Sequence, residues 1–194
     1  MPHSRKCDLL AFVLLACAAP PASAQEVPLD AGTVKAAVFA ETNAYRASKN
    51  LPQVQQNAAL EAAATAYATY LAEHEATGHN ADGSNPGKRA AAQGYKWCFY
   101  SENVWSSFRK PETTLSQELA NQAMDGWKKS PGHNANLLEK RAHEMGVGAA
   151  GWKQDGGKDI FRVVQVFAAE CAGKRRSEQS IGEMLSGALD ALRR

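Results

Sequence analysis

The chain has little excess charge, few cysteines and no long apolar run. Its 22 basic and 20 acidic residues give a formal net charge of +2, which leaves no basic surplus for binding nucleic acid. The apolar run over residues 9–19 is too short for a membrane-spanning helix, which needs about 20 apolar residues. No segment repeats along the sequence. We therefore expect neither a nucleic-acid-binding protein nor a repeat array, and no transmembrane helix in the mature chain.

Two sequence signatures of hydrolytic enzymes are also missing. In the segment HEATGH, His74 and His79 are five residues apart rather than four, and Gly78 interrupts the helix. They cannot form the HExxH helix of zinc proteases, because its two histidines must share one face. Ser130 is not part of a GxSxG motif, so the nucleophile elbow of α/β-hydrolases is absent as well.

The first 24 residues have the three-part layout of a secretory signal. Two basic residues precede the apolar run, and the small residues 22–24 form a cleavage site. We expect residues 1–24 to be removed and residues 25–194 to be secreted, to the periplasm or to the extracellular space. The alternative is a bacterial lipoprotein signal, which would leave a lipid attached to Cys17.

Four cysteines are present, and two of them, Cys7 and Cys17, fall within the signal. Cys98 and Cys171 remain in a chain that we expect to enter an oxidising compartment, where thiols commonly pair. We therefore predict a disulfide between Cys98 and Cys171. The alternative is two separate buried thiols.

The order of the periodic segments predicts an α+β domain. Helices are expected to begin at Asp30 and Asn57, which are good N-caps, and Gly78 should end the second. We then expect a short helix (residues 88–94), an aromatic-rich strand (96–105) and two further helices (111–127 and from 130 onward). Two strands (145–152 and 160–169), joined by an Asp-Gly-Gly turn, should follow. Residues 172–194 form a basic and then amphipathic tail, which either packs on the domain or extends from it.

Two polar residues in these segments are candidates for a functional site. Ser130 and Pro131 are typical of a helix start, which places His133 in the first helical turn, where the positive end of the helix lowers the pKa of an imidazole. The resulting neutral ring is the form that binds metal. Glu102 lies inside a mostly apolar strand, where a carboxylate is costly unless it is paired. The alternatives are a histidine that only satisfies local backbone and a glutamate on a solvated sheet face.

Six motifs, taken in this order, resemble the CAP superfamily (cysteine-rich secretory, antigen-5 and pathogenesis-related proteins) in its bacterial SCP-like branch. They are NAYR (43–46), HNADGS (79–84), RAAAQGY (89–95), SENVW (101–105), WKKSPGHNANLL (127–138), and GVG followed by VVQVF. The resemblance implies a three-layer α-β-α sandwich with a small central antiparallel sheet over residues 25–171. It also implies a pocket that contains His79, Glu102 and His133. The family's second glutamate is replaced here by Ser130, which lacks a carboxylate's charge.

This His-Glu-His set predicts a weak, exchangeable site for a divalent metal. His79 and His133 would bind the ion, and Glu102 would orient a ring or a bound water. Zinc suits the set better than magnesium or calcium, which prefer oxygen ligands. No organic cofactor is implied.

The resemblance favours a secreted, non-catalytic module that binds a lipid, a sterol or a cell-envelope component. Two alternatives stay open. The first is a metal-dependent hydrolase in which Glu102 is the general base, or a serine hydrolase in which Ser130 is the nucleophile and His133 the base. The second is a structural protein anchored to the envelope through Cys17 or through the amphipathic tail.

Overall fold

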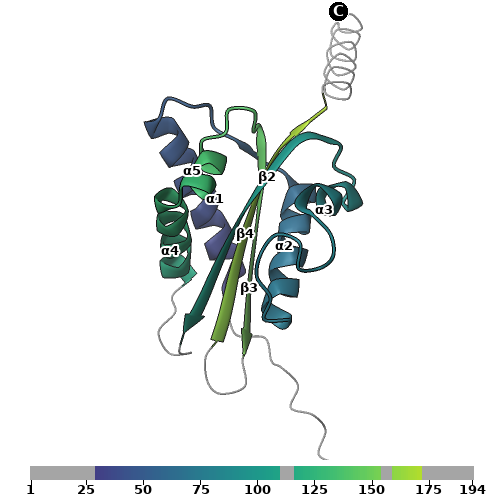
Figure 1. Cartoon of the computed structure of the whole chain (residues 1–194). Helices are drawn as coiled ribbons and strands as arrows, with labels where there is room; N and C mark the ends of the chain where they lie inside the picture. Colours follow the sequence, from purple (N-terminus) through teal and green to yellow (C-terminus); the bar gives the residue numbers. More distant parts are fainter. Residues whose placement is uncertain (1–28, 110–115, 154–158, 172–194) are drawn as a thin grey trace, which may run out of the picture.

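The fold is an α+β sandwich with a sheet between two layers of helices (Figure 1). The computed structural model describes residues 29–109, 116–153 and 159–171. One face of the sheet is covered by α1 (Ala31–Ser48), α4 (Ser116–Lys129) and α5 (Pro131–Leu137), and the other by α2 (Ala58–Glu73) and α3 (Pro86–Ala92). The three-layer architecture expected from the sequence is therefore confirmed.

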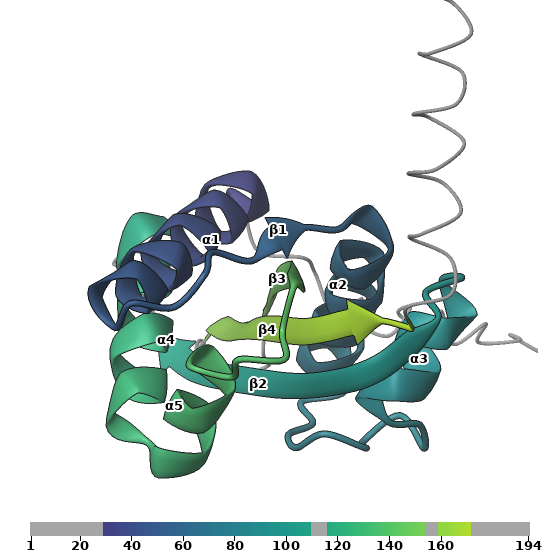
Figure 2. The ribbon, with the colours of Figure 1, turned by 90° about the horizontal axis from the view of Figure 1, so that it is seen from above.

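The sheet has four strands in the order β1-β3-β4-β2 (Figure 2). Antiparallel pairing joins β3 (Glu144–Lys153) to β4 (Asp159–Glu170), and β4 to β2 (Trp97–Arg109). The predicted antiparallel sheet is thus present in its three long strands. A two-residue strand that the sequence did not indicate, β1 (Gln55–Gln56), pairs with β3 in parallel and makes the sheet mixed. Strand β2, which carries Glu102, lies at one edge of the sheet.

The predicted helix starts are confirmed, but the end of α2 is not where the sequence placed it. Asp30 and Asn57 accept hydrogen bonds from the first-turn amides of α1 and α2. We predicted that Gly78 ends α2, whereas the helix ends at Glu73. The reason is that Glu75 adopts a left-handed φ of 51° and the Ala76 amide donates back to a carbonyl in the last turn. A glutamate therefore occupies the position at which helices usually use glycine.

Several predicted segments fall outside the described residues. These are the signal (1–24) with Cys17, the tail (172–194), the start of the helix expected at 111–114, and the turn at 154–158. The short helix predicted at 88–94 is α3, which begins two residues earlier, at Pro86. None of the described helices is long and apolar enough to cross a membrane.

The core consists of two apolar layers on either side of β4, whose residues are buried along nearly the whole strand. Helix α2 packs directly against β3 because glycines leave room for it. A Cβ atom built on Gly148 would lie only 2.3 Å from the carbonyl carbon of Ala64 in α2, well inside van der Waals contact. The helix that leads into the site loop is therefore fixed against the sheet by backbone-to-backbone packing.

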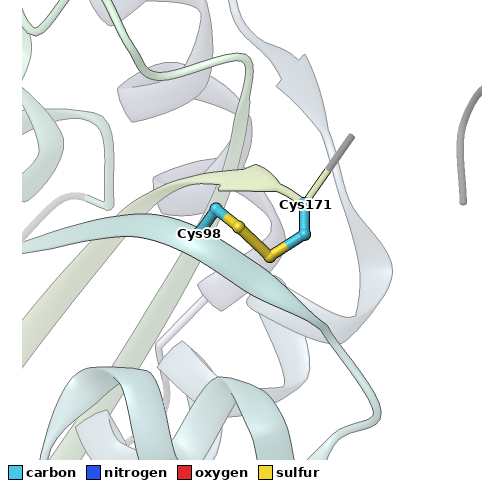
Figure 3. Close-up of a disulfide and its surroundings, with 2 residues drawn as sticks. All are labelled: Cys98 and Cys171. Atoms are coloured by element: carbon cyan, nitrogen blue, oxygen red, sulfur yellow. A yellow bond between two sulfur atoms is a disulfide. The ribbon is translucent and has the colours of Figure 1, made fainter. Parts of the chain in front are cut away.

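A disulfide joins Cys98, near the start of β2, to Cys171, the residue directly after β4 (Figure 3). The two Cα atoms are 4.8 Å apart, and the residues are separated by 73 positions in the sequence. The predicted pairing is confirmed. A loop of this length corresponds to about 4 kcal/mol in the chain-entropy model, so the bond holds an edge strand to the central strand.

Candidate functional site

The site begins with a direct contact between His79 and Glu102. His79 lies in the loop between α2 and α3, and its Nδ1 is 2.8 Å from Oε1 of Glu102, which comes from the middle of β2. The glutamate side chain is 1% exposed and the histidine side chain 47%. Because a carboxylate accepts hydrogen bonds, Nδ1 carries a proton, and in the neutral ring the other nitrogen, Nε2, keeps its lone pair. The buried carboxylate thus orients a half-exposed imidazole.

Arg89 of α3 holds this pair in place. Its guanidinium donates to Oε2 of Glu102 at 2.8 Å, to the backbone oxygen of His79 at 3.0 Å, and to Oδ1 of Asp82 at 3.0 Å. It also stacks over the ring of Tyr67, with Cζ 3.4 Å from the ring centroid. The charge of Glu102 is therefore paired inside the protein, and the loop that carries His79 is tied to α3.

Two tyrosines of α2 form hydrogen bonds with the backbone of the same loop. The hydroxyl of Tyr67 donates to the Gly78 oxygen at 2.7 Å and accepts from the Ala81 amide at 3.2 Å. Tyr70 donates to the Ala81 oxygen at 3.1 Å. The backbone on both sides of His79 is therefore fixed by the helix that precedes it.

His133 approaches from the other helical layer. It lies in the first turn of α5 and is partly buried, and its backbone oxygen accepts from Nδ2 of Asn103 at 3.3 Å. Asn136, one turn further along α5, donates to the backbone oxygen of Glu102 at 3.1 Å and to Oδ1 of Asn103 at 2.9 Å. Asn103 in turn donates to the buried Gln165 of β4. This amide network docks α5 on β2 at the position of Glu102.

The pKa values of the two histidines are shifted in opposite directions. The hydrogen bond to Glu102 raises the pKa of His79, although burial acts against it. Burial lowers the pKa of His133, and the charge of His79 lowers it further. The direction of the His133 shift is the one predicted, with burial as its largest cause.

Ser130 stands at the N-cap of α5, as expected, but its side chain makes no capping hydrogen bond. Among the described residues, no hydrogen bond joins Ser130 to His79, Glu102 or His133. The set that the structure ties together is therefore His79 and Glu102, with Arg89 as an additional member. The sequence analysis placed Arg89 only within a family motif. The signal that could have found it is the need of Glu102, in an apolar strand, for a nearby cation.

Few side chains at this site could bind a metal ion. Within the described part of the chain, no three His, Cys, Asp or Glu side chains are grouped so that they could hold a metal ion. The carboxylate of Glu102 is already bonded on one oxygen to His79 and on the other to Arg89. The described residues therefore do not form a closed structural zinc site.

The chain is similar to known proteins in sequence and in fold. The model of the cysteine-rich secretory protein (CAP) family matches residues 39–167. An outer surface protein from Borrelia burgdorferi has a similar structure, with a TM-score of 0.59 and 20% identity over 76% of this chain and 99% of that one. An extracellular protein with an SCP domain from Bacillus anthracis gives a TM-score of 0.56 at 20% identity, covering 72% of this chain and 41% of that one. No curated protein matches the chain.

These similarities define an α-β-α sandwich of the CAP type, shared with bacterial proteins of low sequence identity. The family model spans well over half of the sequence. The chain belongs to the cysteine-rich secretory protein (CAP) family.

Proposed function

We propose that the protein is an exported, non-catalytic binding module that holds a divalent transition-metal ion weakly between His79 and His133. The observation that carries this proposal is the hydrogen bond from His79 Nδ1 to the buried Glu102. Carboxylates commonly orient metal-binding histidines in this way, leaving the opposite nitrogen for the ion. The lowered pKa of His133 favours the neutral ring that a metal requires.

The chemistry of the two ligands favours zinc among the common divalent ions. Imidazole nitrogen suits zinc, whereas magnesium and calcium prefer oxygen. Two protein ligands leave at least two positions for water or for a ligand, so binding is weak and exchangeable. The ion would supply a positive charge to which a donor atom of a partner could bind. No organic cofactor is part of the proposal.

The alternative function, a hydrolase with Glu102 as general base, has less support. A general base must reach the proton that it removes, directly or through one water. Both oxygens of Glu102 are hydrogen-bonded within the protein, and its side chain is 1% exposed. The version with Ser130 as nucleophile lacks a contact between that serine and His133 among the described residues.

The proposed partner is a lipid, a sterol or another envelope component. The similar bacterial proteins are described as an outer surface protein and an extracellular protein, which agrees with the expected signal over residues 1–24. A cavity of about 240 Å³ lies next to the site, between α2 and α3, and Arg89 and Tyr67 are among its lining residues. This volume is smaller than that of most small-molecule sites. It therefore favours a single chain or side group over a whole sterol.

Calorimetric titration with zinc tests the proposal. The chain 25–194 should bind one ion, and the His79→Ala and His133→Ala variants should each lose most of that affinity. The matched control is His143→Ala, because His143 is an exposed histidine outside the site. Unchanged binding in both site variants, or no binding by the parent chain, would refute the metal site. A rate of ester or peptide hydrolysis that vanishes in Glu102→Gln would instead support the enzyme.

A further inference from the structure

The half of β2 that follows Glu102 has unpaired backbone groups along one side. This strand lies at an edge of the sheet (Figure 2), and the backbone oxygen of Glu102 accepts from Asn136 of α5, so it points away from β4. Backbone groups of alternate residues in a strand point to the same side. The amides and carbonyls of Val104, Ser106 and Phe108 therefore also point outward, and no hydrogen bond within the described part of the chain reaches them.

The opposite edge of the sheet is covered. There β1 pairs with the first two residues of β3, and the Asn57 amide donates to the Met145 oxygen. By the same alternation, the next outward-pointing residues of β3 are Val147 and Ala149, which are only 3% and 5% exposed. Among the described strands, β2 is therefore the edge to which another strand can add. A second copy that extends this sheet has to pair β2 with β2.

The free stretch of β2 lacks the features that keep edge strands from pairing. Residues 104–108 read VWSSF, without a charge or a proline, and the irregularity in the β2–β4 register lies at the other end, at residues 97–99. Charges, prolines and bulges are the usual protection of natural edge strands. Phe108 is 53% exposed and lies near the buried guanidinium of Arg162, with 5.1 Å between Cζ and the ring centroid. An exposed, uncharged edge of this kind is a template for a further strand.

We propose that this edge pairs antiparallel with the same edge of a second copy, about a two-fold axis at Ser106. Ser106 then lies opposite Ser106 of the partner subunit, and Val104 lies opposite Phe108 of the partner subunit. In this register every outward backbone group of residues 104–108 meets another one. The pairing sets an aromatic side chain opposite a β-branched one, which is favourable, and it brings no like charges face to face. Because both copies use the same edge, the interface closes at a dimer.

The dimer is expected to be weak, because only three residues of each copy exchange backbone hydrogen bonds. Interfaces that bury less than about 1,200 Å² are typically transient, so we expect a dissociation constant on the order of 100 µM. The inference goes beyond the proposed function and is independent of it. His79 and His133 lie in a loop and in α5, outside the paired stretch, so the dimer does not require the metal.

Analytical ultracentrifugation of the chain 25–194, from about 10 to 500 µM, tests the dimer. EDTA in every sample prevents association through metal ions shared between histidines. The weight-average mass should rise with concentration towards that of a dimer. Ser106→Pro should raise the dissociation constant at least about tenfold, because proline removes an outward amide without breaking the ladder to β4. The matched control is Ser106→Ala, which keeps the amide and should dimerise like the parent chain. Urea unfolding shows whether each variant is folded.

Cross-linking tests the register without changing any backbone hydrogen bond. Ser106→Cys should form an intermolecular disulfide under mild oxidation, because Cα atoms of such a pair lie about 5.5 Å apart, within the range of a disulfide. The matched control is the neighbouring serine. In Ser107→Cys the two Cα atoms would be about 8 Å apart, so cross-linking should be at least about tenfold slower. Non-reducing electrophoresis measures both rates.

Four results would overturn the proposal. They are a monomer at every concentration, a dimer of unchanged affinity in a folded Ser106→Pro variant, equal losses in Ser106→Ala and Ser106→Pro, and equal cross-linking of the two cysteine variants. If Ser106→Pro does not fold, the cross-linking comparison decides the question alone, because both cysteine variants keep the complete backbone ladder.

Discussion

Replacing Arg89 by alanine should leave the buried carboxylate of Glu102 without its positively charged partner. The two side chains are 10% and 1% exposed and their atoms lie 2.8 Å apart. Removing one partner of a buried ion pair typically destabilises a protein by about 3 to 5 kcal/mol. The half-exposed His79 still hydrogen-bonds one carboxylate oxygen and offsets part of this effect. We therefore expect Arg89→Ala to lower the free energy of unfolding by about 3 kcal/mol.

Urea denaturation of the oxidised chain, followed by tryptophan fluorescence, measures this change as a shift of the midpoint at constant slope. The matched control is Arg141→Ala. Arg141 also makes a two-pronged ion pair, with Glu139, but it is 70% exposed, and surface pairs contribute little. Its removal should leave the midpoint nearly unchanged.

A double variant separates two contributions to the loss of stability in Arg89→Ala: the unpaired buried charge of Glu102 and the lost packing of Arg89 on Tyr67. In Arg89→Ala with Glu102→Gln, no buried charge remains, so this protein should be more stable than Arg89→Ala alone by about 1 to 2 kcal/mol. A double variant that is less stable than the single one would refute the reasoning. So would a loss below about 1 kcal/mol in Arg89→Ala, because a buried pair should cost more to break.

Three further predictions follow from the fold and the site. Gly148→Ala should destabilise the chain by more than about 2 kcal/mol, because an added methyl group meets the α2 backbone. The control Gly132→Ala should leave stability nearly unchanged, because a Cβ atom there would have nothing within 4 Å. Thermal unfolding of the two variants measures the difference. Reducing the disulfide should lower stability by about 4 kcal/mol, measured in urea with and without reductant. Glu102→Gln should lower the pKa of His79 in an NMR titration, because its raised pKa comes mainly from that carboxylate. In the parent chain this contact stabilises the fold most at pH below about 6.5, and the stabilisation is lost as the pH rises through the folded pKa.

Local chemistry explains what the sequence could predict. Asp30 and Asn57 begin helices because their side chains bind amides within three residues, a rule that needs no tertiary information. The long strands follow from apolar runs and a turn signal, and the disulfide follows from the number of cysteines and the expected compartment. Glu102 was a candidate because it is a carboxylate in an apolar strand, His79 was a candidate from the family resemblance, and the structure places the two in direct contact.

The remaining features depend on contacts between distant segments. Two exposed glutamines form β1 only because β3 passes beside them, and no local pattern marks such a strand. Helix α2 ends early partly because the buried Arg162 of β4 donates to the Ala76 oxygen at 3.1 Å, a contact across 86 positions. Arg89 gains its role only when α3 is folded back against β2. Propensity and periodicity describe segments one at a time and therefore miss these three features.

An anomalous diffraction map, recorded at the zinc edge from crystals of the chain 25–194 grown with zinc, tests the proposed metal site most directly. We expect one peak within bonding distance of His79 Nε2 and of a ring nitrogen of His133, with Glu102 still bonded to His79 Nδ1. A map with no peak between these two rings, or with zinc bound only at other histidines, would contradict it.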